Sequence, residues 1–277
     1  LIRRRIMVGR YPSSTAFNSP RLAVGHMAKI LFFDIETAPN MSYVWGQWQQ
    51  DVIEHVQEWY MLCFSYKWEH QKSTHVVALP DFKIYDGDPE NDSQVVKKLW
   101  ELLDEADIVI GHNSDAFDIK KANARFAYHD FGPTSHYNTV DTLKIARRHF
   151  KFNSNRLGHL GEHLGLGGKE TTGGFQTWAG CMRGDVKARG IMKKYANQDV
   201  NILVDVYERL RPWATTHPNR NVIDATSHAC PTCGSNALQK RGTRQTRTMT
   251  YQTYQCQRCR SYCRSRLADN MTRTEVV

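Results

Sequence analysis

The spacing of apolar residues divides the chain into an early part with strand-like runs and a later part with helical periodicity. Three apolar runs rich in strand-forming residues come first, at positions 29–36, 59–68 and 74–85. The pattern then alternates between helix, strand and helix over positions 93–106, 107–112 and 114–129. Ser114 or Asp115 is the predicted N-cap of the last of these. Strands followed by helices that alternate with strands predict an α/β fold, with a mixed β-sheet flanked by helices.

Three more segments have helical periodicity, and they cover positions 139–150, 155–166 and 185–210. We expect Gly190 to break the last of them, and the glycines between positions 165 and 174 to form a loop. The periodic pattern ends at Arg211 and Pro212, and the polar stretch 214–221 has the composition of a linker. The sequence therefore predicts one domain over residues 27–213 and a smaller module over residues 214–277.

The net charge changes sign along the chain. Residues 1–26 carry +5, residues 27–211 carry −3 and residues 212–277 carry +7. Basic flanks are typical of proteins that bind a polyanion, because each neutralised phosphate releases counterions, although solvated surface charge explains them equally well. We expect residues 1–26 to be a basic extension outside the fold, with Met27 as the natural start. A genuine basic arm is the alternative.

Composition is typical of a water-soluble globular protein. With 277 residues, of which 40 % are hydrophobic, the chain is large enough to bury a core. No apolar run approaches the roughly 18 to 20 residues that a membrane-spanning helix needs, and the arginine-rich start lacks the apolar stretch of a secretory signal. We therefore expect a soluble, cytoplasmic protein with no membrane partner.

Two carboxylates end the first apolar run, KILFFDIE. Side chains alternate along a strand, so Asp34 and Glu36 share one face while Ile35 points to the other. Two like charges at the end of a buried strand repel each other unless a cation lies between them, and a hard divalent ion suits oxygen ligands. Alone the pattern is weak, since about one D-x-E is expected by chance in a chain of this length. A polar strand end explains it as well.

Other polar residues follow elements where they could complete such a site. Asn113 follows the predicted strand 107–112, and Asp118 lies in the first turn of the next helix, where the helix dipole favours an ionised carboxylate. Tyr195 and Asp199 are four residues apart and share a face of the last helix. Taken singly, Asp118 is better explained as a helix cap and Asp199 as a surface acid.

Together these residues form three motifs in order, D-x-E at 34–36, N-x-x-x-F-D at 113–118 and Y-x-x-x-D at 195–199. The set resembles the motifs of the DEDD exonucleases of the ribonuclease-H-like superfamily, which includes the proofreading domains of DNA polymerases. The tyrosine is typical of the DEDDy subgroup. The resemblance spans about residues 29–210. With SYVWGQW after the first motif and cysteines at the end, the layout is also similar to stand-alone bacteriophage exonucleases that carry a C-terminal zinc ribbon.

The resemblance implies a metal-dependent 3′-to-5′ exonuclease that hydrolyses the phosphodiester bonds of DNA. It implies a role for Tyr195 in orienting the attacking water, since an unperturbed tyrosine, with a pKa of about 10, is a poor base at neutral pH. Replication or repair proteins are candidate partners, and the host cytoplasm is the expected location if a phage encodes the chain. Two Mg²⁺ or Mn²⁺ ions would be held by Asp34, Glu36, Asp118 and Asp199. The substrate would be contacted by Thr37, Asn113 and Phe117.

Several alternatives remain open at this level. The sequence does not distinguish DNA from RNA, so an exoribonuclease of the same fold is one alternative. A zinc-ribbon nucleic-acid-binding protein that has lost catalysis is another, although the complete carboxylate set argues against it.

Other residues near the motifs have simpler expected roles. Asp141 is expected to cap a helix. Aromatic residues after the first motif either stack a terminal base or pack in the core or on the surface; they are Tyr43, Trp45 and Trp48. Because tyrosine occupies the position where the sister subgroup has a histidine base, we expect packing or solvent exposure for His112, His159 and His163.

Five of the seven cysteines lie near the C-terminus. Two C-x-x-C pairs among them have the spacing of a four-cysteine zinc ribbon, and their residues are Cys230, Cys233, Cys256 and Cys259. Disulfides are the alternative, which a cytoplasmic location disfavours. Cys263 is the one substitute ligand nearby. The isolated Cys63 and Cys181 are expected to be buried packing residues.

The segment 238–255 between the two cysteine pairs alternates polar and apolar residues like a β-hairpin. Basic residues in this segment and after it interleave with Tyr251, Tyr254 and Tyr262, a composition that suits phosphate contacts and base stacking. We expect the module to bind nucleic acid, with protein binding as the alternative. The basic residues are Lys240, Arg241, Arg244, Arg247, Arg258, Arg260, Arg264 and Arg266.

Overall fold

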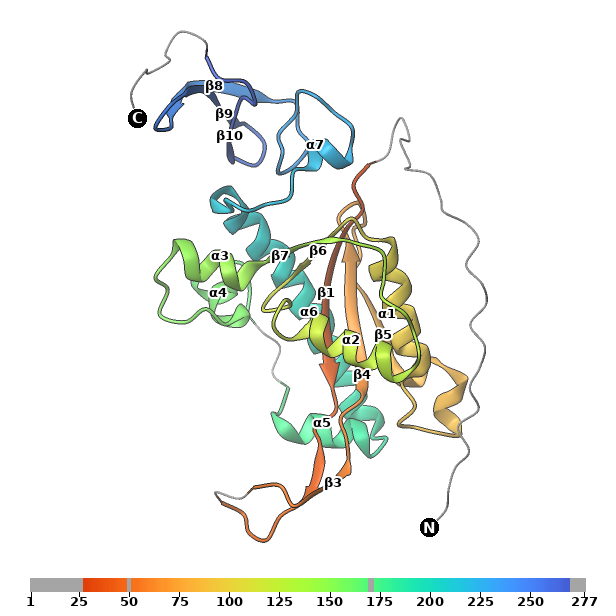
Figure 1. Ribbon diagram of the computed structural model, residues 1–277. Helices are drawn as coiled ribbons and strands as arrows, with labels where there is room; N and C mark the ends of the chain where they lie inside the picture. Colours follow the sequence, from red (N-terminus) through yellow and green to blue (C-terminus); the bar gives the residue numbers. More distant parts are fainter. Residues whose placement is uncertain (1–26, 49–50, 169–171, 270–277) are drawn as a thin grey trace, which may run out of the picture.

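A five-stranded mixed sheet forms the centre of the computed structural model, which describes residues 27–48, 51–168 and 172–269 (Figure 1). The strand order is β5-β4-β1-β6-β7. Strands β1, β6 and β7 run parallel, whereas β4 is antiparallel to β1 and β5. The strands are β1 (Ile30–Thr37), β4 (Met61–Trp68), β5 (His75–Ala78), β6 (Ile108–Gly111) and β7 (Asn138–Asp141). The expected mixed sheet is confirmed, and the basic extension 1–26 lies outside the described residues.

Helices cover both faces of this sheet. On one face, α1 (Ser93–Glu105) and α2 (Asp118–Tyr128) pack against Phe33 and Ile35 of β1. On the other face, Ile30 and Phe32 pack against three helices, which are α3 (Thr142–His149), α4 (Leu157–His163) and α6 (Val186–Leu210). Because β1 is buried from both sides, its sequence is a continuous apolar run rather than an alternating one.

Three element boundaries differ from those expected. The third apolar run is a strand only over β5. Two short 3₁₀ helices follow, Leu79–Asp81, with Pro80 in its first turn, and Lys83–Asp86. Helix α2 begins at Asp118, so neither Ser114 nor Asp115 is its cap, because residues 114–117 form a turn after the positive φ of Asn113. The segment 139–150 begins as β7 before it turns into α3.

The long last helix is continuous through Gly190, contrary to the expected break. Its 25 residues bury Ala188, Met192 and Ala196 against the sheet domain, and tertiary packing on both sides of the glycine outweighs the roughly 1 kcal/mol that glycine costs in a helix. Periodicity had also not predicted α5 (Phe175–Met182) or the hairpin of β2 (Met41–Tyr43) and β3 (Glu54–Gln57). None of the helices in the described ranges combines the length and apolar composition needed to cross a membrane.

The C-terminal part is a small three-stranded sheet in the order β10-β9-β8. Its strands are β8 (Leu238–Gln245), β9 (Thr250–Cys256) and β10 (Tyr262–Arg264), preceded by the short helix α7 (Arg220–Ile223). The expected hairpin between the cysteine pairs is confirmed, since β8 and β9 are antiparallel neighbours. Figure 1 shows this sheet at the top, beyond the amino end of β1.

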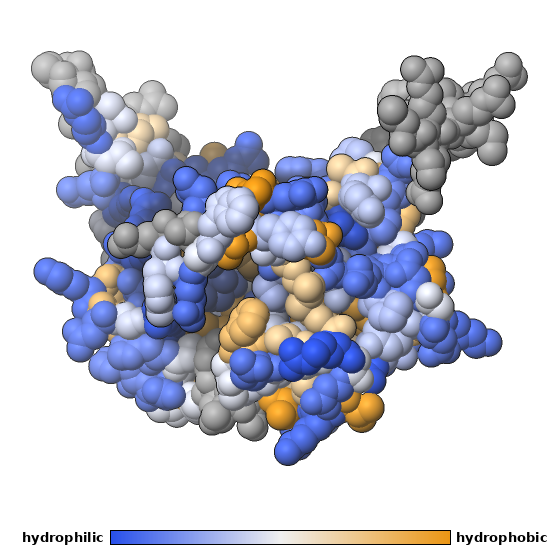
Figure 2. All heavy atoms as spheres, turned by 90° about the horizontal axis from the view of Figure 1, so that it is seen from below, coloured by the Kyte–Doolittle hydropathy of each residue, from blue (hydrophilic) through white to orange (hydrophobic). Residues whose placement is uncertain are grey.

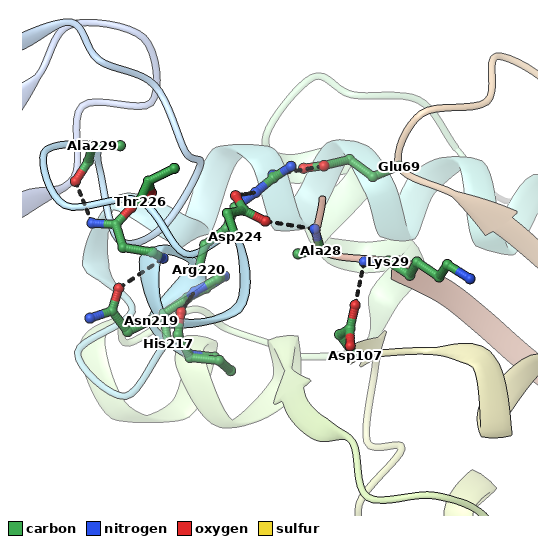
Figure 3. A network of polar contacts seen from close by, with 12 residues as sticks. Ala28, Lys29, Glu69, Asp107, His217, Asn219, Arg220, Asp224, Thr226 and Ala229 are labelled. Atoms are coloured by element: carbon green, nitrogen blue, oxygen red, sulfur yellow. Dashed lines mark hydrogen bonds and ion pairs between the residues drawn. The ribbon is translucent and has the colours of Figure 1, made fainter. Parts of the chain in front are cut away.

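Ion pairs connect α7 to the amino end of the central sheet (Figure 3). The buried Arg220 guanidinium contacts the carboxylate of Glu69, just after β4, at 2.8 Å and that of Asp224 at 3.0 Å. Asp224 in turn accepts a hydrogen bond from the backbone N–H of Ala28, just before β1, at 2.6 Å. The end of the polar stretch 214–221 is therefore anchored to the sheet.

Candidate metal centres and active site

Three carboxylates meet where β1 lies against α6. Strand alternation places Ile35 in the core beside α1 and α2, and directs Asp34 and Glu36 to the face that α6 covers. Asp199 projects from α6 toward them and is only 4 % exposed. Each of the three residues offers a carboxylate oxygen within 4.8 Å of the other two. Two oxygens bound to one Mg²⁺ lie at most about 4.2 Å apart, so small side-chain movements would close the group on such an ion.

Asp118 reaches the same region from the opposite face of the sheet. It is the first residue of α2, is 3 % exposed, and accepts a hydrogen bond from the backbone N–H of Ile35 at 3.2 Å. Burial raises the pKa of its carboxyl to about 7, and the Ile35 hydrogen bond offsets only part of that increase. Since burial destabilises the ionised carboxylate, a nearby cation would stabilise it.

A cavity of about 830 Å³ joins these residues with most of the others that the motifs singled out. Thr37 is not among the described residues that line it, although the resemblance implied a substrate contact there. The motifs are far apart in sequence, so only the fold brings them together. The predicted residues that line the cavity are Asp34, Glu36, Asn113, Phe117, Asp118, Tyr195 and Asp199.

Asp141 helps to shape this cavity from β7. Its carboxylate accepts hydrogen bonds from the backbone N–H groups of Leu143 and Asn113, both at 2.9 Å. The first bond caps α3 as expected, and the second holds Asn113, whose φ of 66° lies in the left-handed region. The neighbouring Asp115 instead pairs with Lys144 at 2.5 Å.

Several cavity residues were not predicted from the sequence. The basic side chains of Arg147, from α3, and Arg156, just before α4, line it together with His112 and His159. The expectation that His112, His159 and His163 pack or face solvent is therefore incomplete, because two of them line the cavity. His163 is not among the described lining residues, and its ring stacks on that of His159 with centroids 5.7 Å apart. Nothing in local sequence distinguishes Arg147 from its neighbour, because the orientation of α3 alone directs it inward.

The aromatic residues after the first motif lie on the projecting hairpin of β2 and β3. Tyr43 and Trp45 are exposed, the latter by 90 %, and neither lines the cavity. Figure 2 views the molecule from the side on which the hairpin projects in Figure 1, and apolar patches interrupt the hydrophilic surface there. The alternative of surface placement therefore describes these residues better than stacking at the site.

The four cysteines of the C-x-x-C pairs form a second candidate metal centre. All four are buried, and their sulfur atoms lie within 4.8 Å of one another. The Sγ–Sγ distances of 3.6 Å for Cys230–Cys259 and for Cys233–Cys256 far exceed a disulfide bond of about 2.05 Å. They are close to the roughly 3.8 Å between thiolates bound tetrahedrally to Zn²⁺ at about 2.3 Å. The group could thus hold a structural zinc ion, and Cys263 lies outside it.

Hydrogen bonds among these thiols favour ionisation at one of them. The thiols of Cys230 and Cys233 lower the pKa of Cys259 well below its usual value, because both hydrogen-bond to its sulfur. A thiolate is the form of cysteine that binds metal. The two isolated cysteines, Cys63 and Cys181, are buried as expected.

Comparison with known proteins identifies a likeness of fold. No protein-family model matches the sequence, and no curated protein matches it. Among solved structures, the family B DNA polymerase from the hyperthermophilic archaeon Pyrobaculum calidifontis matches with a TM-score of 0.51 and 15 % identity. The match covers 85 % of this chain and 32 % of the polymerase, so the chain spans about a third of that protein. At this identity the likeness concerns the fold alone.

Proposed function

We propose that this protein is a metal-dependent 3′-to-5′ exonuclease of ribonuclease-H-like fold that acts on DNA. The observation that carries the proposal is the convergence of three sequence-distant motifs, at 34–36, 113–118 and 195–199, on one cavity. The structural likeness to a DNA polymerase supports it, because the proofreading domains of such polymerases carry the motifs that this sequence resembles. In this proposal residues 27–213 form the catalytic domain.

The donor set of the cavity fits Mg²⁺ or Mn²⁺. The clustered side chains offer carboxylate oxygens, which hard divalent cations prefer, and the buried Asp118 carboxyl needs a positive partner to ionise fully. When bound, two such ions supply an acidified water and neutralise charge on the scissile phosphate and the leaving oxygen. The residues that would hold them are Asp34, Glu36, Asp118 and Asp199.

The chain's own side chains position the substrate and the water. The ring of Tyr195 packs edge-on against Trp178 of α5, with centroids 5.9 Å apart, which orients it at the cavity. In the proposed reaction its phenol hydrogen-bonds the attacking water. Arg147 and Arg156 supply positive charge for phosphates at the wall formed by α3 and the start of α4. Phe117, 42 % exposed at the cavity, stacks on a base near the 3′ end.

End-labelled oligonucleotides test this proposal directly. Single-stranded DNA, duplex DNA and RNA are incubated with Mg²⁺ or Mn²⁺ and the wild-type protein, Asp34→Asn or Asp199→Asn. We expect stepwise loss of 3′ nucleotides from DNA that both substitutions abolish, because each removes a ligand charge. Asp205→Asn, an exposed acid on the same helix α6, is the matched control and keeps activity.

Full activity in either ligand variant would contradict the proposal. Faster degradation of RNA than of DNA would favour the exoribonuclease alternative. Binding of nucleic acid without any hydrolysis would favour a protein that has lost catalysis.

We further propose that residues 214–277 hold zinc and bind nucleic acid. The eight basic residues predicted for this role are all exposed in the described part of the module. One of them, Arg264, lies over the ring of Tyr251 with its guanidinium carbon 3.8 Å from the centroid. Such a pair combines charge for phosphate with a ring for stacking. If Arg264→Ala left the salt dependence of DNA binding unchanged, the module would be better explained as a protein-docking element.

A further inference from the structure

Aromatic and basic side chains alternate along one face of α2, beginning at the candidate active site. Phe117 precedes the helix, and Lys121, Arg125 and Tyr128 follow at intervals of four, four and three residues, so all four share one face. Trp59, from the segment after β3, lies against the same face. In Figure 1, α2 crosses the lower part of the sheet, above the hairpin that contains β3.

The rings and cations are in contact from one end of this face to the other. The Lys121 ammonium lies 3.7 Å from the Trp59 ring centroid and 5.5 Å from that of Phe117. The Arg125 guanidinium carbon lies 5.7 Å from the Trp59 centroid and 4.2 Å from that of Tyr128. The series extends over about 16 Å of helix. We call these five residues, Phe117, Lys121, Arg125, Tyr128 and Trp59, the α2 track.

The two cations of the α2 track differ in what they are free to bind. Arg125 is buried and forms two contacts, of 2.5 and 2.7 Å, with the carboxylate of Asp92, so its charge is already neutralised. Lys121 has no carboxylate partner among the described residues. Its charge, held in place by Trp59, is available to an anion from outside the protein.

The α2 track joins two cavities. Phe117 lines the cavity with the carboxylates, and Trp59, Arg125 and Tyr128 line a second one of about 670 Å³. Tyr128 is 70 % exposed, so its ring is accessible. Three acids, Glu58, Asp88 and Glu90, also line the second cavity and would repel phosphates there. These acids limit how far a nucleic acid could follow this face.

We propose that the α2 track binds the single-stranded part of a nucleic acid whose 3′ end lies in the carboxylate cavity. Bases stack on Phe117 and Tyr128, and Lys121, positioned by Trp59, contacts a backbone phosphate. An unpaired strand fits because its bases expose their faces to aromatic rings, which a duplex does not allow. The inference rests on the proposed nuclease function for the position of the 3′ end.

Binding to an inactive protein tests the α2 track separately from hydrolysis. On the full-length Asp199→Asn background, anisotropy of a 5′-labelled octamer of dT is measured at several salt concentrations for Lys121→Ala, Tyr128→Ala and Trp59→Phe. Lys120→Ala, which removes the same charge from an exposed neighbouring position, is the matched control. An octamer of U and a DNA duplex of eight base pairs are the comparison ligands.

We expect Lys121→Ala to weaken octamer binding about fivefold and to lower the salt dependence by roughly the contribution of one phosphate. Tyr128→Ala should weaken it about tenfold at unchanged salt dependence, because it removes a stacking ring and no charge. Trp59→Phe should keep most of the affinity, since a phenyl ring also holds a cation.

Equal affinities for Lys121→Ala, Tyr128→Ala and Lys120→Ala would overturn the inference, as would an equal loss for duplex and single strand. Octamer binding that depends on the α2 track while the wild-type protein hydrolyses nothing would instead refute only the nuclease function.

Discussion

The two candidate metal-binding groups of side chains differ in how the chain assembles them. The carboxylates come from β1, α2 and α6 and are separated by up to 165 residues, from Asp34 to Asp199. The cysteines come from two short turns at 230–233 and 256–259. The sheet domain has two large apolar clusters, to which the elements that carry the carboxylates belong. The small module has scarcely any core besides its cysteines, with Leu238 half-buried against them.

Metal removal should therefore affect the folding of the two regions to different extents. A module with so little apolar core depends on its ion for folding, whereas clustered carboxylates repel each other without one. The sheet domain should stay folded without metal, at reduced stability, and should lose its function.

The largest effect is expected from Cys233→Ser, which removes one of the four proposed zinc ligands. In zinc-finger peptides metal binding is worth about 10 to 16 kcal/mol, so we expect the module to unfold while the central sheet keeps its cooperative transition. Native mass spectrometry would measure bound zinc, and hydrogen exchange would locate the loss of protection to residues 228–266. Cys263→Ser, outside the four-cysteine group, is the control and should retain zinc. Cysteines that resist alkylation in a zinc-free protein would point to disulfides and contradict this prediction.

The next largest effect concerns Asp118 in the protein without divalent metal at the carboxylates. Its pKa is raised from 3.8 to about 7, so the folded state binds this proton more tightly than the unfolded state does. The contribution of Asp118 to the free energy of unfolding should therefore be most favourable below about pH 4, fall as pH rises from about 4 to 7, and stay reduced above 7, by up to about 4 kcal/mol. Asp118→Asn keeps an oxygen for the Ile35 N–H and should remove this loss.

Urea unfolding at pH 5 and pH 8, with zinc present and Mg²⁺ absent, would measure the Asp118 effect. Asp205→Asn is the control. If Asp118→Asn were less stable than the wild type at pH 8, the prediction would be wrong, because contacts within the fold would already stabilise the ionised Asp118 carboxylate. The same variant should also lose its stabilisation by added Mg²⁺.

Arg220→Ala tests how the two regions are connected. It leaves Glu69 and Asp224 without their cation at the junction in Figure 3. We expect the free energy of unfolding to fall by about 2 kcal/mol, which is less than for a fully buried pair because Glu69 is 30 % exposed. Hydrogen exchange should rise in residues 217–235 while zinc remains bound. Arg209→Ala, an exposed arginine near the end of α6, is a suitable control. Unchanged protection would mean that the ion pairs do not anchor the module.

The smallest effect is expected from single cationic side chains of the cavity. Arg147→Ala should raise the KM for an oligonucleotide about fivefold, roughly 1 kcal/mol, with a smaller change in kcat. Arg148→Ala is a close control, because Arg148 is adjacent on α3 but does not line the carboxylate cavity. Equal effects of the two substitutions on KM would show that overall charge, and not placement, matters.

Local patterns predicted much of the fold and of the two candidate sites. The runs around β1 and β4 and the periodicity of α1 are strong signals because burial is regular over many residues. Predictions failed where a tertiary contact overrode local preference, as at Gly190, which lies inside a helix packed on both sides. The start of α2 was misplaced because Asn113 adopts a left-handed conformation held by Asp141, a residue 28 positions away.

By itself the sequence determined the chemistry of the protein, namely which residues offer oxygen, sulfur or charge. The C-x-x-C pairs were recognisable because both ligands of a pair lie within one turn of the chain. Only the tertiary structure decided that Arg147, Arg156 and His159 line the same cavity as the carboxylates, and that Trp59 lies on Lys121. The physical reason is that these contacts depend on how helices lie on the sheet, and the packing of the whole core sets that orientation rather than any local spacing.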